Sequence, residues 1–158
     1  MEKKDVITGI ALDENVAKVG VLGVPDQPGI AAKIFSALAE EKINVDMIIQ
    51  SVHAQSNAAD MAFTVSRTDL PRAEAIAKEV ATKLRASGVV ADAKVCKISI
   101  VGVGMISQPG VAAKMFSTLS DEGINIQMIS TSEIKISCVI ADKNGKQAVK
   151  ALHKAFIK

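Results

Sequence analysis

Aromatic residues are scarce in this chain of 158 residues, which contains no Trp, no Tyr and four Phe. The hydrophobic core must therefore be built from aliphatic side chains. Nucleic-acid binding relies on aromatic rings for base stacking and on a basic face, whereas Lys, Arg, Asp and Glu are interspersed here to a net charge of +2. We expect no nucleic-acid partner.

Cysteines and long apolar runs are also scarce. Cys96 and Cys138 lie about 40 residues apart in strand-like runs, without the CxxC spacing or the His companion of a metal site. We expect two buried, reduced thiols, and we predict neither a metal nor a cofactor. No stretch approaches the roughly 18 apolar residues of a membrane helix, and the first five residues do not lead into a signal peptide. The expected location is the cytoplasm, and we expect no membrane partner.

A long internal repeat is what the sequence does contain. Residues 27–51 read QPGIAAKIFSALAEEKINVDMIIQS and residues 108–132 read QPGVAAKMFSTLSDEGINIQMISTS, identical at about 15 of roughly 25 positions. A repeat longer than one helix indicates a duplicated structural unit. The length of the chain fits two units of about 70 to 80 residues each.

Short strands and amphipathic helices follow one another in the order β-α-β-β-α-β in the first copy. We expect its strands over 16–24, 45–52, 61–66 and 89–94, and its helices over 30–41 and from Thr68 to the stop at Ser87 and Gly88. In the second copy we expect strands over 97–103, 126–130 and 134–140, and helices over 111–122 and 146–157. The second copy then ends without its fourth strand.

A strand-like segment over 5–12, DVITGIAL, precedes the first copy and has no place in it. We predict that this segment completes the second sheet. The expected fold class is α+β, with two ferredoxin-like βαββαβ domains whose antiparallel sheets carry their helices on one face. The expected domains are 16–95, inserted, and 1–15 plus 96–158.

The loop after the first strand of the first copy carries the predicted chemistry. Gly29 lets a ligand approach the backbone, and the helix that follows begins with amide N–H groups suited to a carboxylate. Asp26 is placed to accept an ammonium. A ligand with both a carboxylate for the amides and an ammonium for Asp26 is a free α-amino acid. Asn44 and Gln50 add the amide donors and acceptors that orient a ligand.

A purely structural explanation of the same residues stays open. In it, Asp26 and Pro28 only make a tight turn, and Asn44 only caps one. Many sequences make such turns, whereas both copies keep Gln-Pro-Gly before the helix and Ile-Asn after it. This recurrence favours a functional loop.

Two segments resemble a known family. VPDQPGIAAKIFSALAEEKINVDMIIQ and the later STSEIKIS are similar to the regulatory region of aspartate kinase, and nearly the whole chain resembles a pair of ACT domains. The resemblance implies an interlocked pair in which the front of the chain completes the second domain. It also implies regulation, because the family phosphorylates L-aspartate with ATP through a separate catalytic lobe and senses end products through its ACT pair.

The resemblance assigns effector contacts to both copies. In the first copy they are Asp26, Pro28, Gly29, Ile30, Ala31, Asn44 and Gln50, and in the second Gln108, Pro109, Gly110, Val111, Asn125 and Ile126. Met105, Ile106 and Ser107 stand where the first copy has Pro25 and Asp26, so the second copy lacks the amine-binding carboxylate. Glu133 is a candidate carboxylate for a second effector such as lysine; alternatively it is an exposed hairpin residue that is only solvated.

The resemblance also implies the partners of the chain. They are threonine and/or lysine as effector, a second copy bound through the ACT domains, and the catalytic subunit or domain of aspartate kinase. Effector binding should then tighten the dimer. Which amino acid binds stays open, as does whether the chain is a natural small subunit or a fragment of a longer enzyme.

Two other functions remain as alternatives. The first is a stand-alone ACT-pair sensor that controls transcription or another enzyme. The second is a small ferredoxin-like enzyme, which needs catalytic groups. His53 lies in a loop and His153 on the last helix, with no nucleophile at a meaningful spacing. We therefore predict no catalytic residue in this chain.

Overall fold

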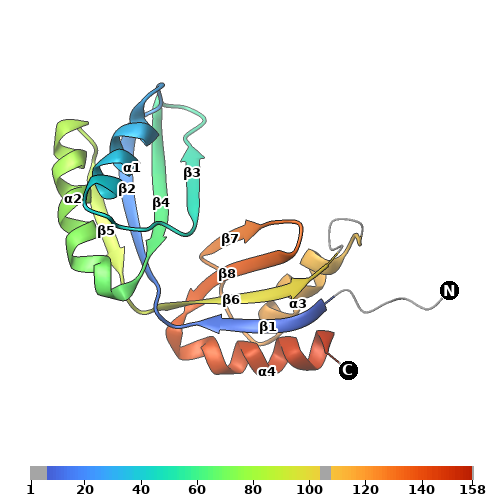
Figure 1. Cartoon of the computed structure of the whole chain (residues 1–158). Helices are drawn as coiled ribbons and strands as arrows, with labels where there is room; N and C mark the ends of the chain where they lie inside the picture. Colours follow the sequence, from blue (N-terminus) through green and yellow to red (C-terminus); the bar gives the residue numbers. More distant parts are fainter. Residues whose placement is uncertain (1–6, 104–107, 158) are drawn as a thin grey trace. The chain divides into compact units, whose positions relative to one another are not determined.

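The computed structural model describes residues 7–103 and 108–157 and divides the chain into two compact units (Figure 1). The central unit is Asn15–Ala93. The split unit combines Met1–Glu14 with Lys94–Lys158, as far as these ranges are described. These limits differ by one or two residues from the domain limits expected from the sequence.

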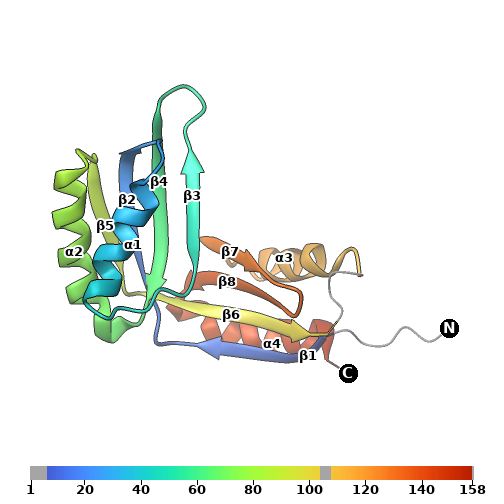
Figure 2. The ribbon, with the colours of Figure 1, turned by 45° about the horizontal axis from the view of Figure 1, so that its top comes forward.

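The central unit is a four-stranded antiparallel sheet with two helices on one face (Figures 1 and 2). Its elements are β2 (Ala17–Pro25), α1 (Ile30–Glu40), β3 (Ile48–Val52), β4 (Ala58–Val65), a 3-10 turn (Arg67–Asp69), α2 (Leu70–Lys83) and β5 (Gly88–Asp92). The strand order is β3-β4-β2-β5. This is the ferredoxin-like arrangement predicted from the sequence.

The split unit repeats this plan. Its elements are β1 (Ile7–Asp13), β6 (Val95–Gly102), α3 (Val111–Asp121), β7 (Met128–Thr131), β8 (Lys135–Ala141), a 3-10 turn (Asp142–Asn144) and α4 (Gly145–Phe156). The strand order β1-β6-β8-β7 places β1 where the central unit has β5. Antiparallel pairs run from Ile7 with Gly102 to Asp13 with Lys97. The prediction that the N-terminal strand completes the second sheet is therefore confirmed.

The β3–β4 hairpin differs from the expected one. Strand β3 begins at Ile48 rather than at 45, because the buried Thr64 hydroxyl accepts a hydrogen bond from the Met47 N–H at 3.0 Å and interrupts the regular ladder. Strand β4 begins at Ala58 rather than at 61, because its first residues pair with both β2 and β3. The loop between the strands is therefore shorter than expected.

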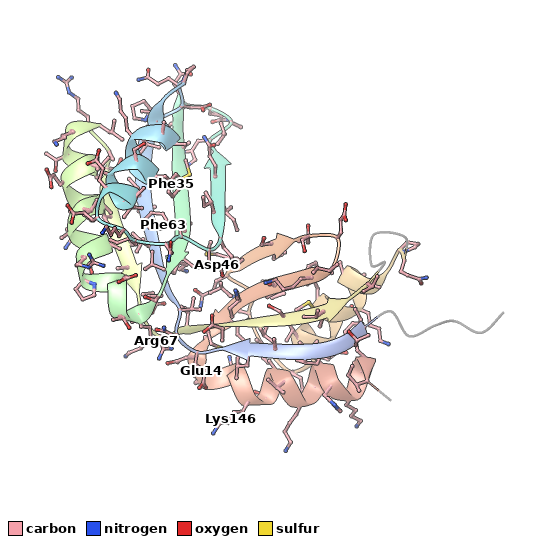
Figure 3. All side chains as sticks on the ribbon, viewed as in Figure 1. Glu14, Phe35, Asp46, Phe63, Arg67 and Lys146 are labelled. Carbon is pink, nitrogen blue, oxygen red and sulfur yellow. The ribbon has the colours of Figure 1, made fainter. Side chains whose placement is uncertain are left out.

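Each unit has its own aliphatic core, as the composition predicts. In the central unit the one aromatic pair is Phe35 on α1 and Phe63 on β4, edge to face with ring centroids 5.5 Å apart (Figure 3). Ile34 and Leu38 of α1 pack into the same core. Truncating a buried ring such as Phe63 to alanine costs about 3–5 kcal/mol, so this contact fixes α1 firmly on the sheet.

Cys138 is expected to resist thiol reagents while the chain is folded. Its side chain is fully buried on β8, and this burial raises the pKa of the thiol to about 12. Only the thiolate reacts, and an unfolded cysteine titrates near 8.5, so labelling at pH 8 should be slower in the folded chain by roughly a thousandfold. Mass spectrometry after iodoacetamide treatment, with and without urea, measures this. Rapid labelling of Cys138 without urea would contradict the buried position.

Candidate functional site

The helix after the first strand of each unit starts from the same backbone geometry. Gly29 precedes α1 with φ +92°, and Gly110 precedes α3 with φ +94°. L-residues rarely adopt this left-handed conformation. An added Cβ would meet nothing within 4 Å at either position. The repeated glycine is therefore required by backbone conformation, and the space in front of it is open.

The amino end of α1 offers hydrogen-bond donors. The Lys33 N–H donates to the Gly29 carbonyl at 3.0 Å, and in α3 the Lys114 N–H donates to the Gly110 carbonyl at 2.9 Å. Within the described ranges, no side chain caps either helix. The N–H groups of the first turn, including that of Ala31, thus face outward and favour an anion.

The loop before α1 is tied to the β3–β4 hairpin. The Asp26 N–H donates to the Asn57 carbonyl at 2.8 Å, while the Asp26 side chain is exposed. Pro25 pairs with Ala58 at the end of β2. Figures 1 and 2 show the loop and the hairpin at the same end of the central unit. The Asp26 carboxylate is therefore displayed at the end of the unit where α1 begins.

Gln50 faces the side of the sheet on which α1 packs. It lies directly opposite Met61, which is buried beneath the helices, and directly opposite residues project to the same face. Strand β3 is an edge strand, so Gln50 is exposed beside the helix. Its neighbours on that face, Ile48 and Val52, are 53% and 57% exposed. The Gln50 amide therefore lies on the edge strand, between two exposed apolar side chains, on the face of the sheet that α1 packs against.

Asn44 lies far from this loop within its own unit. It follows the carboxyl end of α1, where Ile43 is buried and its N–H bonds the Leu38 carbonyl at 3.1 Å. Eleven helical residues rise about 16 Å, which separates Asn44 from Gly29 by the length of the helix. The structure therefore brings together Asp26, Gly29 and the first turn of α1, and leaves Asn44 at the other end.

The repeated Ile-Asn has the same setting in the split unit. Ile124 is buried and its N–H bonds the Leu119 carbonyl at 3.0 Å, matching Ile43 and Leu38. This is the hydrogen bond of a Schellman helix end. Packing alone accounts for the repeated isoleucine. The exposed Asn125, with Ile126 after it, lies at the end of α3 opposite to Gly110.

A hollow of about 460 Å³ lies at the amino end of α3. It is lined by Gln108, Pro109, Gly110, Val111, Ala112, Thr131, Ser132, Glu133 and Ile136. The loop residues assigned from the sequence thus share one hollow with Glu133. The Thr131 and Ser132 hydroxyls were missed, although Ser132 is a repeated position. The comparison of Met105, Ile106 and Ser107 with Pro25 and Asp26 lies outside the described residues.

Asp60 and His53 form a polar cluster that the sequence pattern did not indicate. One Asp60 carboxylate oxygen accepts the Gly23 N–H at 2.9 Å, and the other lies 3.1 Å from His53 Nε2. The Gly23 donation, and after it the His53 contact, lower the pKa of Asp60 below its usual value. No spacing signal could have paired these residues, because only the β3–β4 hairpin brings them together.

The described ranges were searched for groups of metal-ligating side chains and for helices long and apolar enough to cross a membrane. Across residues 7–103 and 108–157, no group of three or more His, Cys, Asp and Glu side chains is arranged to hold a metal ion. The helices of these ranges all lack the length and apolar character of a membrane span.

Models of the ACT domain match residues 19–83 and residues 98–156. The fold and the repeated loop thus define a pair of ACT domains. The regulatory subunit of aspartate kinase from Thermus thermophilus, in a ligand-free crystal structure, is 45% identical, with a TM-score of 0.91 over 97% of this chain and 99% of that one. The chain belongs to the aspartate kinase family and forms its regulatory ACT region.

Two further relatives agree. A chain in a crystal structure of aspartokinase alpha and beta subunits is 50% identical, with a TM-score of 0.89 over 95% of this chain and 98% of that one. Aspartate kinase from Pseudomonas fluorescens is 49% identical over 154 residues, which are 98% of this chain and 37% of the relative. The chain therefore corresponds to little more than a third of the curated relatives that it matches, and the resemblance to the regulatory region is confirmed.

Proposed function

We propose that this chain binds a free amino acid at the amino end of α1 and thereby mediates feedback inhibition of aspartate phosphorylation. The observation that carries the proposal is the conjunction of an exposed Asp26 with the outward-facing amides after Gly29. An α-amino acid presents an ammonium and a carboxylate a few ångströms apart. The Asp26 carboxylate takes the ammonium, and the amides of the first turn of α1 take the carboxylate.

Threonine is the effector proposed for the central unit. Pro28, Gly29, Ile30 and Ala31 provide the turn and the donors, and Gln50 supplies an amide for the side-chain hydroxyl. The small size of threonine suits a site that lies between a helix end and one edge strand. If a second copy covers Gln50, an effector without a hydroxyl leaves this amide unpaired, which gives selectivity for threonine.

A second, chemically different site is proposed for the split unit. The hollow at the amino end of α3 contains Gln108, Pro109, Gly110 and Val111 together with the Glu133 carboxylate. Glu133 lies on the β7–β8 hairpin and not in the loop before the helix. This position suits the side-chain ammonium of lysine better than an α-amino group. We therefore assign lysine to this site.

A homodimer is proposed to complete both sites. Asn44 and Asn125 lie a helix length from the loops to which the resemblance joins them, so one unit alone cannot place both groups on one ligand. A second copy that runs antiparallel brings its asparagine to the loop. Such contact also covers Ile48 and Val52, whose exposure is otherwise unexplained. The further partner is the catalytic part of aspartate kinase, in the cytoplasm.

Calorimetric titration tests the proposed function. The expected result is saturable binding of threonine, and of lysine at a separate site, with no binding of unrelated amino acids such as alanine. Sedimentation of the same samples should show a larger dimer fraction with threonine present, because a ligand that bridges two copies favours the assembled state. Absence of binding for both amino acids, singly and together, would refute the proposal.

A further inference from the structure

The end of strand β2 departs from regular pairing just before the effector loop. Its register against β4 shifts between Val21 and Val24, and Gly23 within this bulge has φ +64°. An added Cβ at Gly23 would collide with the Ser87 side chain, so the bulge is also closed from the β5 side. The bulge therefore determines the direction in which the chain continues towards Asp26.

The Asp60 carboxylate joins this bulge to the β3–β4 hairpin. One oxygen accepts the Gly23 N–H at 2.9 Å, and the other lies 3.1 Å from His53 Nε2. The His53 N–H donates to the Ala58 carbonyl at 3.0 Å and closes the hairpin. The same hairpin holds the Asp26 N–H through Asn57. Asp26 is thus anchored by a network that has Asp60 at its centre.

The split unit has no such network among its described residues. Asp60 lies opposite Ser51, and the repeat aligns Ser51 with Ser132. The Ser132 N–H donates to the Lys135 carbonyl at 2.8 Å, so Lys135 occupies the place of Asp60. The carboxylate is therefore present only in the unit that also carries Asp26.

The geometry points to Asp60 as a positioning residue for the effector loop, which sets the affinity of the central unit for an amino acid by holding Asp26 in place. This inference rests on the proposed function. Asp60 and His53 are 37% and 45% exposed, so the network contributes moderately to stability. Its effect falls mainly on ligand binding, because a site held within about half an ångström of its binding geometry loses little entropy when the ligand arrives.

Substitution of Asp60 tests the inference in the full chain. Asp60→Ala should weaken threonine binding about 5- to 20-fold, whereas Asp60→Asn, which keeps an oxygen for the Gly23 N–H, should stay within about threefold of the unchanged chain. Hydrogen exchange of the Gly23 amide, followed by NMR, should quicken in Asp60→Ala and recover in Asp60→Asn. Equal threonine affinity in Asp60→Ala and the unchanged chain would overturn the inference, as would Asp60→Asn binding as weakly as Asp60→Ala.

Two further variants separate positioning from other effects. Glu79→Ala removes an exposed carboxylate that pairs with Lys83 on α2, and threonine affinity should not change. His53→Ala removes only the second contact of Asp60 and should weaken threonine binding about threefold, so it tests the network if Asp60→Ala unfolds. Unchanged affinity in His53→Ala would count against the network.

Failure of the proposed function gives a different result. In that case the unchanged chain binds neither threonine nor lysine, while the exchange rate of the Gly23 amide still reports whether Asp60 holds the bulge. An unchanged exchange rate in Asp60→Ala would overturn the positioning role on its own.

Discussion

Asp26→Ala is expected to weaken threonine binding by about 100-fold or more while the chain stays folded. Calorimetry should then detect no binding of threonine to the variant. The substitution removes the only described carboxylate proposed to meet the ammonium in the central unit, and losing one partner of a hydrogen-bonded charge pair that becomes buried on binding typically costs about 2–5 kcal/mol. Asp26 is exposed, so its removal should change the free energy of unfolding by no more than about 0.5 kcal/mol. Calorimetry and thermal unfolding measure the two quantities separately.

Matched variants make this result specific. Gln50→Ala should also abolish measurable threonine binding, because the hydroxyl loses its amide partner on β3. Glu79→Ala removes an exposed carboxylate from α2, away from both ends of α1, and should leave threonine affinity unchanged. Lysine binding at the split unit should survive Asp26→Ala, since its proposed carboxylate is Glu133. Threonine affinity that is unchanged in Asp26→Ala would refute the assignment of the site.

Removal of residues 1–14 is expected to unfold the split unit and to leave the central unit folded. Strand β1 supplies all the pairs along one edge of β6, from Ile7 with Gly102 to Asp13 with Lys97. Ile10 and Leu12 also pack against the core that contains Ile98 and Leu152. Without β1 this core opens to water, and the backbone groups along one edge of β6 lose their partners. The free energy lost exceeds the few kcal/mol that stabilise a unit of this size.

Hydrogen exchange measured by mass spectrometry can follow both units in the shortened chain. Peptides from β6, β8 and α4 should lose protection, and peptides from β2, β4 and α2 should keep it. Addition of a synthetic peptide of residues 7–14 should restore protection to the split unit, because that strand pairs through its backbone and needs no covalent link. Full protection of β6 in the shortened chain, without the peptide, would contradict this account.

The repeat allowed most of the fold to be predicted. Apolar residues at helical spacing between Ile30 and Leu38 predicted α1 and the face that it packs on the sheet. The same pattern recurs in α3. The second copy lacks a fourth strand, and the N-terminal segment has no place in the first copy. Together these two observations predicted the place of β1. Strand limits were less accurate around Thr64, because a side chain that bonds a distant backbone group leaves no trace in local periodicity.

The candidate site was predicted only in part. Asp26, Pro28 and Gly29 are adjacent along the chain, so their proximity follows from the sequence, and the left-handed φ of Gly29 agrees with the repeated glycine. Asn44 lies a helix length from this loop within its own unit, so its contact with the same effector stays a prediction that depends on a second copy.

The sequence by itself determined the duplication, the order of strands and helices, and the loop that carries Asp26, because each depends on residues close together or on a pattern repeated at a fixed interval. Tertiary structure alone decided which distant groups meet. The antiparallel pairing of β3 with β4 brings the His53 ring within hydrogen-bond distance of the Asp60 carboxylate. A bulge in β2 turns the Gly23 N–H towards the same carboxylate. Such contacts join residues with no common period, so only the folded backbone reveals them.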